Sequence, residues 1–436
     1  MNILLIGSGG REHAFAVKIT DSPKCNKLYV APGNAGTSAI AENVPLAVTD
    51  FEGIKDFILL HHIDMVVVGP EEPLVKGISD FLSQHPSTQD IVVVGPSKQG
   101  AALEGSKDFS KQFMARHGVP TAAYHSFTKD TVDEGLEFIR RQRLPIVLKA
   151  DGLAAGKGVL ILDSYEEAEQ GLKEMLLESK FGVASSKVVV EEYLSGIELS
   201  VFVATDGVSY KILPEAKDYK RIGEQDTGLN TGGMGAVSPV PFADQAFMQK
   251  VEERVVKPTV EGLRKEGIDY KGFLFIGLMN VKGDPWVIEY NVRMGDPETQ
   301  AVLPRIKSDF VDLLHSIGSK TVSGYHLEID LGATATVVMV AGGYPGDYNK
   351  GSKIEGLSSP SHKSTFTFHA GTQLDPAGHV LTNGGRVLGI TGKGIHIKEA
   401  IARAYNRVNE ISWDGHYYRK DIGQDILRYD DAKVPS

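Results

Sequence analysis

The sequence predicts an α/β protein with three parts: an N-terminal domain built on a doubly wound parallel sheet, a central α+β unit that carries a glycine loop, and a C-terminal α+β cap. Short, continuous apolar runs alternate with helix-length segments over the first hundred residues, which is typical of strands buried on both faces. The 436 residues, 42% of them hydrophobic, are enough for roughly two to four domains. The 48 glycines exceed the usual share of about 7%.

Turn residues follow each of the four N-terminal apolar runs. Since ligands bind outside the carboxyl ends of parallel strands, we expect these four loops to lie along one edge and to share a ligand. The first loop, Gly7–Gly10, opens a helix whose free N–H groups would attract a phosphate, with Arg11 nearby. The four predicted strands are Ile3–Ile6, Lys27–Ala31, Met65–Gly69 and Ile91–Gly95.

The central part places a glycine-rich loop between two predicted strands, Pro145–Lys149 and Val159–Leu162. The loop resembles a Walker A loop only superficially, because its spacing is one residue short and Gly158 replaces the hydroxyl residue. Its glycines still allow a close approach of the backbone to phosphate, and Lys149 and Lys157 would neutralise charge. Further elements are predicted as helices at Ser106–His117 and Ser164–Ser179, and as strands at Lys187–Glu191, Leu199–Ala204 and Pro285–Glu289.

The end of the last of these strands carries three polar residues on one face. Strand alternation places Glu289, Asn291 and Arg293 together, with Tyr290 and Val292 on the opposite face. A carboxylate and an amide oxygen suit Mg²⁺ that also holds nucleotide phosphates. An arginine two residues on can bind a carboxylate or phosphate through two N–H groups.

The tail predicts the C-terminal α+β cap, with strands at Ala333–Val340, Ser364–His369 and Arg386–Thr391 and a helix over Ile397–Ile411. We expect domain boundaries at residues 1–103, 104–327 and 328–436.

Composition excludes several classes of protein. The 46 basic and 56 acidic residues give a formal net charge of −10, which argues against a nucleic-acid binder. The single cysteine, Cys25, cannot form an internal disulfide and fits a reducing compartment. No signal peptide or membrane-spanning run is evident, so we expect a soluble, cytoplasmic protein. Zinc ligand clusters and a serine nucleophile motif are absent from the sequence, and Glu12 replaces the third glycine of a dinucleotide fingerprint.

Taken together, the motifs resemble phosphoribosylamine–glycine ligases, which are ATP-grasp enzymes of purine biosynthesis. The resemblance covers essentially the whole chain. Its elements are Gly7–His13, Pro32–Asn34, Gly69–Glu71, Leu103–Lys107, Pro120–Ala122, Lys149–Gly158, Glu191–Leu194, Asn230–Gly235, Glu289–Gln300, Gly342–Pro345, His369–Thr372 and Gly384–Val387.

The resemblance implies a pre-ATP-grasp N-terminal domain and an ATP-grasp domain with a mobile lid of about residues 122–190, which is expected to close over ATP. It also implies a reaction. The glycine carboxylate attacks the γ-phosphate of ATP, and the amine of 5-phosphoribosylamine then displaces phosphate from glycyl phosphate. The implied cofactors are ATP as a substrate and Mg²⁺ or Mn²⁺. The implied partners are these small molecules alone, without nucleic acid or membrane, and the implied state is a monomer.

The resemblance also implies roles for individual residues. ATP is held by Lys107, Lys149, Gly152, Gly156, Lys157, Glu191, Leu194 and Glu198. The metal is held by Glu289 and Asn291. Arg293 and Lys149 act on the reacting groups. The remaining substrates are bound by Gly9, Gly10, Arg11, Asn34, Gly36, Asp218, Asn230, Arg293 and Gly295.

Two positions depart from the family pattern. The usual Asp-His-Lys is Asp218-Tyr219-Lys220, and the usual Gly-Pro-Asn is Gly228-Leu229-Asn230. Asp218 and Asn230 are retained, so we expect activity, while the conformation of this loop is left open. The alternatives are another ATP-grasp carboxylate–amine ligase, a silent nucleotide-binding regulator and a Rossmann oxidoreductase. The presence of Glu289, Asn291 and the lysines disfavours the silent regulator.

Overall fold

The N-terminal sheet contains five parallel strands in the order β3-β2-β1-β4-β5. The computed structural model describes residues 1–153, 158–360 and 362–431. All four predicted strands are present, and a short fifth strand lies at the edge of the sheet beside β2. The strands are β1 (Asn2–Gly7), β2 (Lys27–Pro32), β3 (Glu42–Asn43), β4 (Met65–Val68) and β5 (Val92–Val94).

Helices cover both faces of this sheet, which confirms the doubly wound arrangement. Alternate residues of β1 enter two different cores: Leu4 and Ile6 pack in one, and Ile3 and Leu5 in the other. The first face is covered by α2 (Phe51–Leu60) and α4 (Ile78–Gln84), and the second by α1 (Gly10–Thr20) and α12 (Phe310–Gly318).

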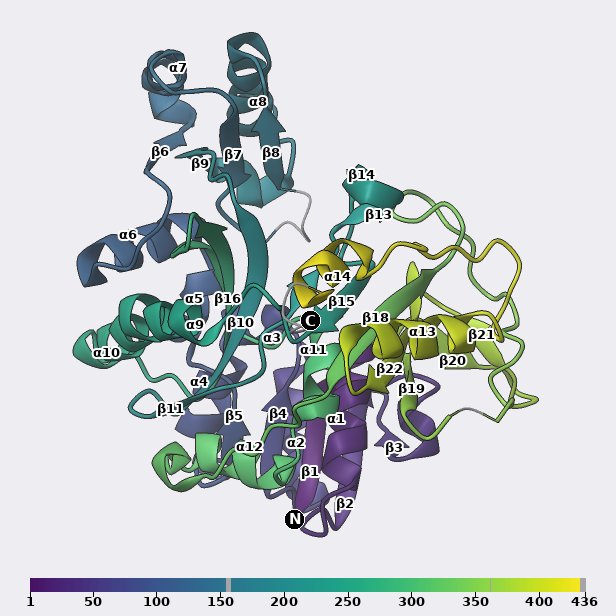
Figure 1. Ribbon diagram of the computed structural model, residues 1–436. Helices are drawn as coiled ribbons and strands as arrows, with labels where there is room; N and C mark the ends of the chain where they lie inside the picture. Colours follow the sequence, from purple (N-terminus) through teal and green to yellow (C-terminus); the bar gives the residue numbers. More distant parts are fainter. Residues whose placement is uncertain (154–157, 361, 432–436) are drawn as a thin grey trace.

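The lid forms a separate four-stranded sheet that stands at the top of Figure 1. Its strand order is β6-β9-β7-β8, and the predicted glycine loop joins the antiparallel strands β7 and β8. Two helices pack on the sheet around a core of their own. The elements are β6 (Tyr124–Thr128), α7 (Val132–Arg140), β7 (Ile146–Ala150), β8 (Val159–Leu162), α8 (Tyr165–Leu177) and β9 (Lys187–Glu192).

A second antiparallel sheet lies below the lid and shares a core with one face of the N-terminal sheet. Its order is β11-β10-β16-β17. Its strands are β10 (Ile197–Thr205), β11 (Tyr210–Ile212), β16 (Gly272–Val281) and β17 (Asp284–Asn291). The helices of this region are α3 (Glu71–Lys76), α5 (Lys98–Gly105), α6 (Lys107–His117), α9 (Gln245–Val251) and α10 (Lys257–Lys265).

The C-terminal sheet includes two strands that precede the expected boundary at residue 328. Its order is β12-β15-β18-β22-β19, so residues 217–218 and 235–238 extend the C-terminal sheet. The strands are β12 (Lys217–Asp218), β15 (Gly235–Ser238), β18 (Ala333–Val340), β19 (Thr365–His369) and β22 (Arg386–Gly394). The accompanying helices are α11 (Glu298–Val302), α13 (Ile397–Val408) and α14 (Gln424–Asp431).

Two small ribbons complete the C-terminal region. One joins β13 (Arg221–Gly223) to β14 (Thr227–Asn230), and the other joins β20 (Thr372–Leu374) to β21 (Val380–Thr382). The first ribbon lies between the C-terminal sheet and the lid in Figure 1.

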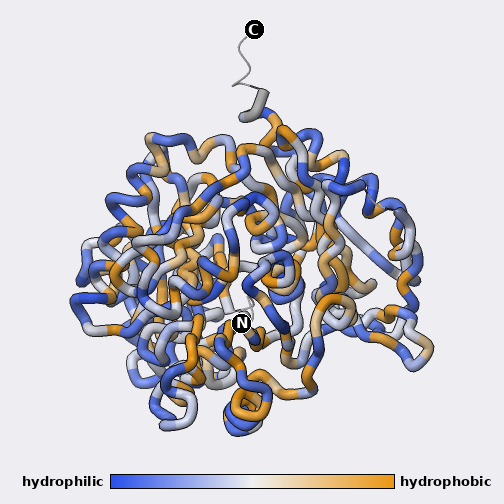
Figure 2. The backbone as a smooth tube through the Cα atoms, turned by 90° about the horizontal axis from the view of Figure 1, so that it is seen from below, coloured by the Kyte–Doolittle hydropathy of each residue, from blue (hydrophilic) through white to orange (hydrophobic). Residues whose placement is uncertain are grey.

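Hydrophobic segments gather inside the molecule and hydrophilic segments outside, as Figure 2 shows. None of the helices in the described ranges has the length and apolar character that crossing a membrane requires.

Candidate active site

The first N-terminal loop is occupied by carboxylates from the protein itself. The Gly9 N–H donates to Glu12 Oε2 at 2.7 Å, and the Arg11 N–H donates to Asp296 Oδ2 at 3.2 Å. The Arg11 guanidinium pairs with Glu12 at 2.6 Å and donates to the Met294 carbonyl at 3.1 Å. The expectation of free N–H groups at this helix start therefore fails for Gly9 and Arg11, because two acidic side chains already satisfy the helix N-terminus.

The second loop joins the first loop to the C-terminal region. The Asn34 amide donates to the carbonyls of Ser8 and His369, each at 2.9 Å. Its oxygen accepts from the N–H groups of Gly36 and Thr37. Asn34 thus uses both donors and its acceptor oxygen within the protein, and its predicted contact with substrate stays a prediction.

Gly36 is held by a close approach of two histidines. A Cβ atom at Gly36 would lie 2.3 Å from His13 Cε1 and 2.7 Å from His369 Cβ.

The fourth loop is bound to the second sheet. Gly95 and Ser97 donate their N–H groups to the carbonyls of Lys271 and Asp269, so this loop is tied to the start of β16.

The predicted polar face of β17 is present. Arg293 Nη2 donates to Asn291 Oδ1 at 3.2 Å, while Tyr290 on the opposite face contacts the Thr259 hydroxyl at 2.6 Å. The Arg293 guanidinium also pairs with Glu104 at 2.9 Å and with Glu71 at 3.3 Å. Arg293 therefore connects the end of β17 to α5 and to the start of α3.

Glu289 lies in a strongly positive environment. Burial alone would raise the pKa of Glu289, but Lys220, Lys149, Lys107 and Arg293 together lower it below its usual value. Among the described residues, no hydrogen bond or ion pair joins the Glu289 carboxylate to another side chain. The carboxylate is thus ionised, and its oxygens are available to a cation.

The lysines reach this position from different elements. Lys149 on β7 donates to the Ile288 carbonyl of β17 at 3.1 Å, which ties the lid to the second sheet. Lys107 begins α6 and donates to the Gly152 carbonyl at 3.3 Å, and burial lowers its pKa. Gly152 itself lies close to the backbone of Ala184, where a Cβ would be 3.1 Å from Ala184 Cα. Two predicted residues of this loop, Gly156 and Lys157, lie outside the described residues.

Glu191, on strand β9 of the lid, is the centre of a buried cluster of charges that includes Lys149 and Lys111. One oxygen, Oε2, pairs with both Lys149 and Lys111 at 3.0 Å, and the other, Oε1, is buried without a hydrogen-bond partner in the described structure. Burial lowers the pKa of Lys111 to about 8. The sequence reasoning missed Lys111. The available signal was its spacing of four residues from Lys107, which places both lysines on one face of α6.

Glu198 and Lys220 form a second pair below the lid. They lie 2.6 Å apart, Glu198 on β10 and Lys220 just after β12. Although burial lowers the pKa of Lys220, the carboxylates of Asp218 and Glu198 raise it well above its usual value. The sequence reasoning also missed Lys220 as a site residue, although it stands in the quoted Asp-Tyr-Lys motif. Leu194 follows β9 in the turn that leads to this pair.

The remaining predicted substrate residues lie around Asp218. Burial raises the pKa of Asp218, and burial together with the charge of Asp218 raises the pKa of Glu298 to about 7. Gly295 approaches Glu298 closely, since a Cβ there would lie 2.3 Å from its Oε2. Asn230 ends β14 opposite Arg221. Glu298 interacts with both Asp218 and Arg293, and the two carboxyls could bind an ammonium group.

Glu289 and Asn291 fit a divalent cation by their chemistry, because hard oxygen ligands and an unpaired carboxylate suit Mg²⁺ or Mn²⁺. No cluster of three or more histidine, cysteine or acidic residues in the described structure could hold a metal on its own. Two protein ligands are what a metal needs when phosphate oxygens supply the others.

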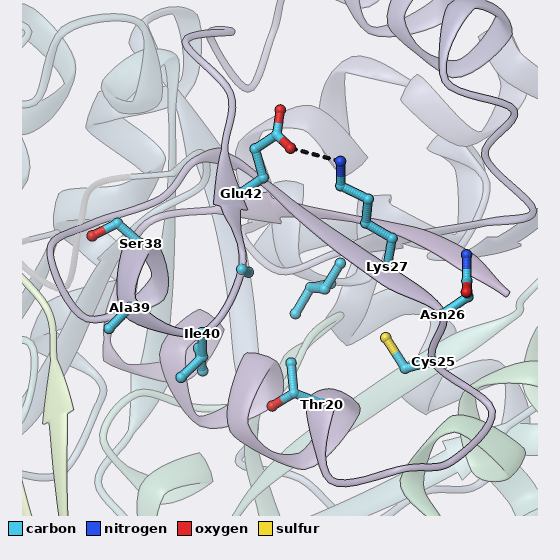
Figure 3. Close-up of a pocket in the computed structure, with 10 residues that line it drawn as sticks. Thr20, Cys25, Asn26, Lys27, Ser38, Ala39, Ile40 and Glu42 are labelled. Atoms are coloured by element: carbon cyan, nitrogen blue, oxygen red, sulfur yellow. Dashed lines mark ion pairs between the residues drawn. The ribbon is translucent and has the colours of Figure 1, made fainter.

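A separate surface pocket of about 540 Å³ lies at the opposite end of the N-terminal sheet (Figure 3). The ion pair of Lys27 and Glu42, 2.8 Å long, crosses its rim. Partial burial raises the pKa of the Cys25 thiol in its wall, so the thiol is a poor nucleophile at neutral pH. The pocket contains none of the predicted site residues.

Solved structures share this fold. The chain resembles a phosphoribosylamine–glycine ligase from Thermotoga maritima with a TM-score of 0.83 and 36% identity, over 97% of this chain and 100% of that chain. A biotin carboxylase domain from Hydrogenobacter thermophilus, in complex with MgADP and bicarbonate, has a TM-score of 0.73 and 16% identity over 96% and 91% of the two chains, which shows a likeness of fold alone. The fold and the lysine and carboxylate groups between the two antiparallel sheets define an ATP-grasp ligase.

Family models match most of the chain. They are described as the N domain, the ATP-grasp (A) domain and the C domain of phosphoribosylglycinamide synthetase, and they match residues 1–104, 105–299 and 334–425. The chain belongs to the phosphoribosylglycinamide synthetase family. It is 45% identical over 436 residues to a phosphoribosylamine–glycine ligase of Vibrio vulnificus strain YJ016, covering 99% of this chain and 100% of the relative. A relative of the same name from Escherichia coli K12 is 46% identical over 97% and 98% of the two chains.

Proposed function

We propose that this protein joins glycine to 5-phosphoribosylamine at the expense of ATP, giving glycinamide ribonucleotide, ADP and phosphate in purine biosynthesis. The observation that carries the proposal is the convergence of Lys107, Lys149 and Lys220 on the ionised Glu289 in a chain of this family. Cations around a metal-binding carboxylate are what a phosphoryl transfer from ATP requires.

The reaction has two steps. A glycine carboxylate oxygen attacks the γ-phosphorus of ATP, and the bond to the β–γ bridging oxygen breaks to release ADP. The amine of 5-phosphoribosylamine then attacks the carbonyl carbon of glycyl phosphate, phosphate leaves, and the nitrogen loses a proton to give the amide. Phosphorylation is needed because a free carboxylate is a poor acyl donor. No covalent intermediate on the protein is required, so catalysis consists of positioning and charge neutralisation.

The phosphates of ATP would be bound by Lys107, Lys149 and the glycine loop. Glu289 and Asn291 would hold Mg²⁺ or Mn²⁺, which neutralises charge on the phosphates when it is bound. The other nucleotide contacts would come from Glu191, Leu194 and Glu198, next to the hinge between the lid and β10. The lid, about residues 122–190, would close over the nucleotide. It would belong to the second of three domains, which comprise residues 1–103, 104–327 and 328–436.

The glycine site would lie where Arg293 meets Asp218 and Glu298. A carboxyl group with a raised pKa gains most from a cationic partner, and the glycine ammonium is such a partner. Arg293 is already shared by Glu71, Glu104 and Asn291, so it would position these groups as well as meet the glycine carboxylate. The ribose phosphate would bind at the loops that contain Gly9, Gly10, Arg11, Asn34 and Gly36.

The experiment is a measurement of ADP release with glycine and freshly prepared 5-phosphoribosylamine, compared with omission of each substrate. Full turnover is expected only with both, and ADP formed equally well without glycine would overturn the assignment. Lys149→Ala should abolish ligation, because it removes a phosphate contact and the link to β17. The exposed lid residue Lys129 offers a matched control, and Lys129→Ala should retain wild-type turnover.

We further infer a monomer in the cytoplasm. The single, half-buried cysteine in 436 residues supports the compartment, because it suits reducing conditions. The monomer is inferred from the family resemblance alone. Sedimentation at micromolar concentration tests the oligomeric state, and a dimer mass would contradict it.

A further inference from the structure

Tyr219 lies between two residues of the active site but points away from it. Its neighbours Asp218 and Lys220 face the site, where Lys220 pairs with Glu198 at 2.6 Å. The Tyr219 side chain is 2% exposed and packs into the core of the C-terminal region, beside Ile422. Tyr219 is also one of the two positions at which the sequence departs from the pattern that it resembles.

The Tyr219 hydroxyl makes two hydrogen bonds to the C-terminal segment. It donates to Asp425 Oδ1 at 2.5 Å and accepts from the Gly423 N–H at 3.0 Å. The hydroxyl lies at the far end of the ring, farther from the backbone than either nitrogen of an imidazole. A histidine at this position would therefore not reach both groups without movement of the backbone.

Two cations lie against the same ring. Lys217 Nζ is 3.8 Å from the ring centroid and Arg419 Cζ is 5.3 Å from it. Lys217 also pairs with Asp425 at 3.0 Å. The ring and its hydroxyl thus hold the end of β12 against the C-terminal segment of residues 417–425, through hydrogen bonds and a cation–π contact.

Arg419 continues this connection to the β13–β14 ribbon. It is 1% exposed, donates to the Arg221 carbonyl at 3.1 Å and pairs with Asp226 at 2.7 Å. Gln225 and Asp226 have positive φ angles of 57° and 55°, and the Gln225 N–H donates to Asp421 at 2.7 Å. The C-terminal segment therefore holds the turn of the ribbon in a conformation that non-glycine residues rarely adopt.

The end of the ribbon returns to the same strand. The Thr231 N–H donates to the Lys220 carbonyl at 2.8 Å, and the Met234 N–H donates to the Tyr219 carbonyl at 2.7 Å. Any movement of Tyr219 would therefore move Asp218, Lys220 and the segment after Asn230 together.

We propose that Tyr219 is a positioning residue, whose hydroxyl fastens the end of β12 to the C-terminal segment of residues 417–425 and thereby sets Asp218 in the glycine site and Lys220 beside it. The role of these two neighbours rests on the proposed function. The C-terminal segment is then part of the machinery that binds glycine, although it contributes no side chain to the substrate.

The test compares two tyrosine hydroxyls in different parts of the molecule. Tyr219→Phe removes the hydrogen bonds to Asp425 and Gly423 and keeps the ring. Tyr325→Phe is the matched control, because it removes a hydroxyl that donates to the Asp309 carbonyl at 3.0 Å and packs against a different core. Tyr219→Phe should raise the KM for glycine about 10-fold with kcat changed less than about 3-fold, whereas Tyr325→Phe should leave both within about 2-fold. Equal KM values for glycine in the two variants would overturn the proposal.

Asp425→Ala tests the same contact from its other side. Asp425 is exposed, so its loss should not prevent folding. It should reproduce the rise in KM. The double variant with Tyr219→Phe should have a KM for glycine within about 2-fold of that of Asp425→Ala alone, because Asp425→Ala already removes the Tyr219 contact together with the ion pair to Lys217. A much higher KM in the double variant would contradict the proposal.

Hydrogen exchange at the Thr231 and Met234 amides gives a readout that does not depend on the substrate. Exchange should accelerate in Tyr219→Phe and stay at the wild-type rate in Tyr325→Phe, and an unchanged rate in both would overturn the proposal. If the wild-type enzyme fails to use glycine, the proposed function fails, while this exchange test of Tyr219 still applies.

Discussion

At the residue scale, the site is organised around Glu289. Its carboxylate stays ionised because three lysines and Arg293 outweigh the effect of burial on its pKa. The same cations would repel one another without it. Glu191 plays a similar part for Lys111 and Lys149, which it holds at 3.0 Å. Both carboxylates therefore allow several lysines to lie close together before a nucleotide arrives.

Glu289→Gln should reduce kcat by at least about 100-fold, because a neutral amide neither holds the metal as well nor balances the lysines. The measurement is ADP release at saturating glycine and 5-phosphoribosylamine over a titration with Mg²⁺. Glu253→Gln changes an exposed carboxylate in the same way and should have no effect. Activity of the Glu289 variant within about 3-fold of the wild type would refute the metal assignment.

Glu298 should make the free energy of unfolding depend on pH. Its pKa is raised to about 7 from an ordinary value of 4.5, so the folded protein keeps a proton that the unfolded chain has lost between these values. Stability should therefore fall as pH rises from about 4.5 to about 7, by up to about 3 kcal/mol, and should not fall further above pH 7 on account of this group.

Glu298→Gln should remove this part of the pH dependence, because the amide does not titrate. Urea unfolding at pH 5 and pH 7.5 measures it, and the variant should gain stability relative to the wild type at the higher pH. An identical pH dependence in both proteins would show that Glu298 titrates normally.

At the scale of elements, the start of α1 depends on close packing against α11. A Cβ atom at Gly10 would lie 2.3 Å from Gln300 Nε2, the group that donates to Asp296 Oδ1 at 2.8 Å. Asp296 in turn accepts from the Arg11 N–H. The first loop, α11 and the helix start therefore form one packed unit, in which glycine is needed for space and not for its backbone angles.

Gly10→Ala should cost about 1–3 kcal/mol through overpacking and should raise the KM for 5-phosphoribosylamine more than that for ATP. Gly324→Ala is the matched control, since a Cβ there meets nothing within 4 Å. Unfolding curves and the two KM values check this prediction. A Gly10 variant that matches the control in both would show that the loop has room to adjust.

At the scale of the whole molecule, the N-terminal and C-terminal regions meet at a pair of histidines, the buried His13 and the half-buried His369. The His369 N–H donates to His13 Nδ1 at 2.7 Å, so this nitrogen of His13 must be unprotonated. Burial, with a smaller effect of His369, lowers the pKa of His13 to about 3, and burial lowers that of His369 to about 4. The contact between α1 and β19 therefore requires a neutral His13 ring.

The contribution of these two histidines to the free energy of unfolding should be fully present above about pH 6.5. It should decrease as pH falls from about 6.5 towards about 4, because the unfolded chain gains protons that the folded protein excludes. Between pH 7 and pH 5 the loss is about 2 kcal/mol for each histidine. His13→Asn keeps an acceptor that does not titrate and should reduce the loss by about that amount in urea unfolding. His326→Asn, at an exposed site, should not.

Local patterns were sufficient for much of the fold and part of the site. The four apolar runs predicted β1, β2, β4 and β5, and strand alternation placed Asn291 and Arg293 on one face of β17, as their hydrogen bond confirms. The sequence did not predict that β12 and β15 join the C-terminal sheet, because strand partners about a hundred residues apart have no periodic signal.

The sequence by itself determined the periodicity of the strands and helices, the glycine turns and the kinds of charged residues available, since these depend on neighbours along the chain. Tertiary structure alone decided which charges meet: Asp296 with the start of α1, Lys111 with Glu191, and Tyr219 with Asp425. The physical reason is that a charge or hydroxyl is satisfied by whichever group packing brings within about 3 Å, and packing depends on the whole chain.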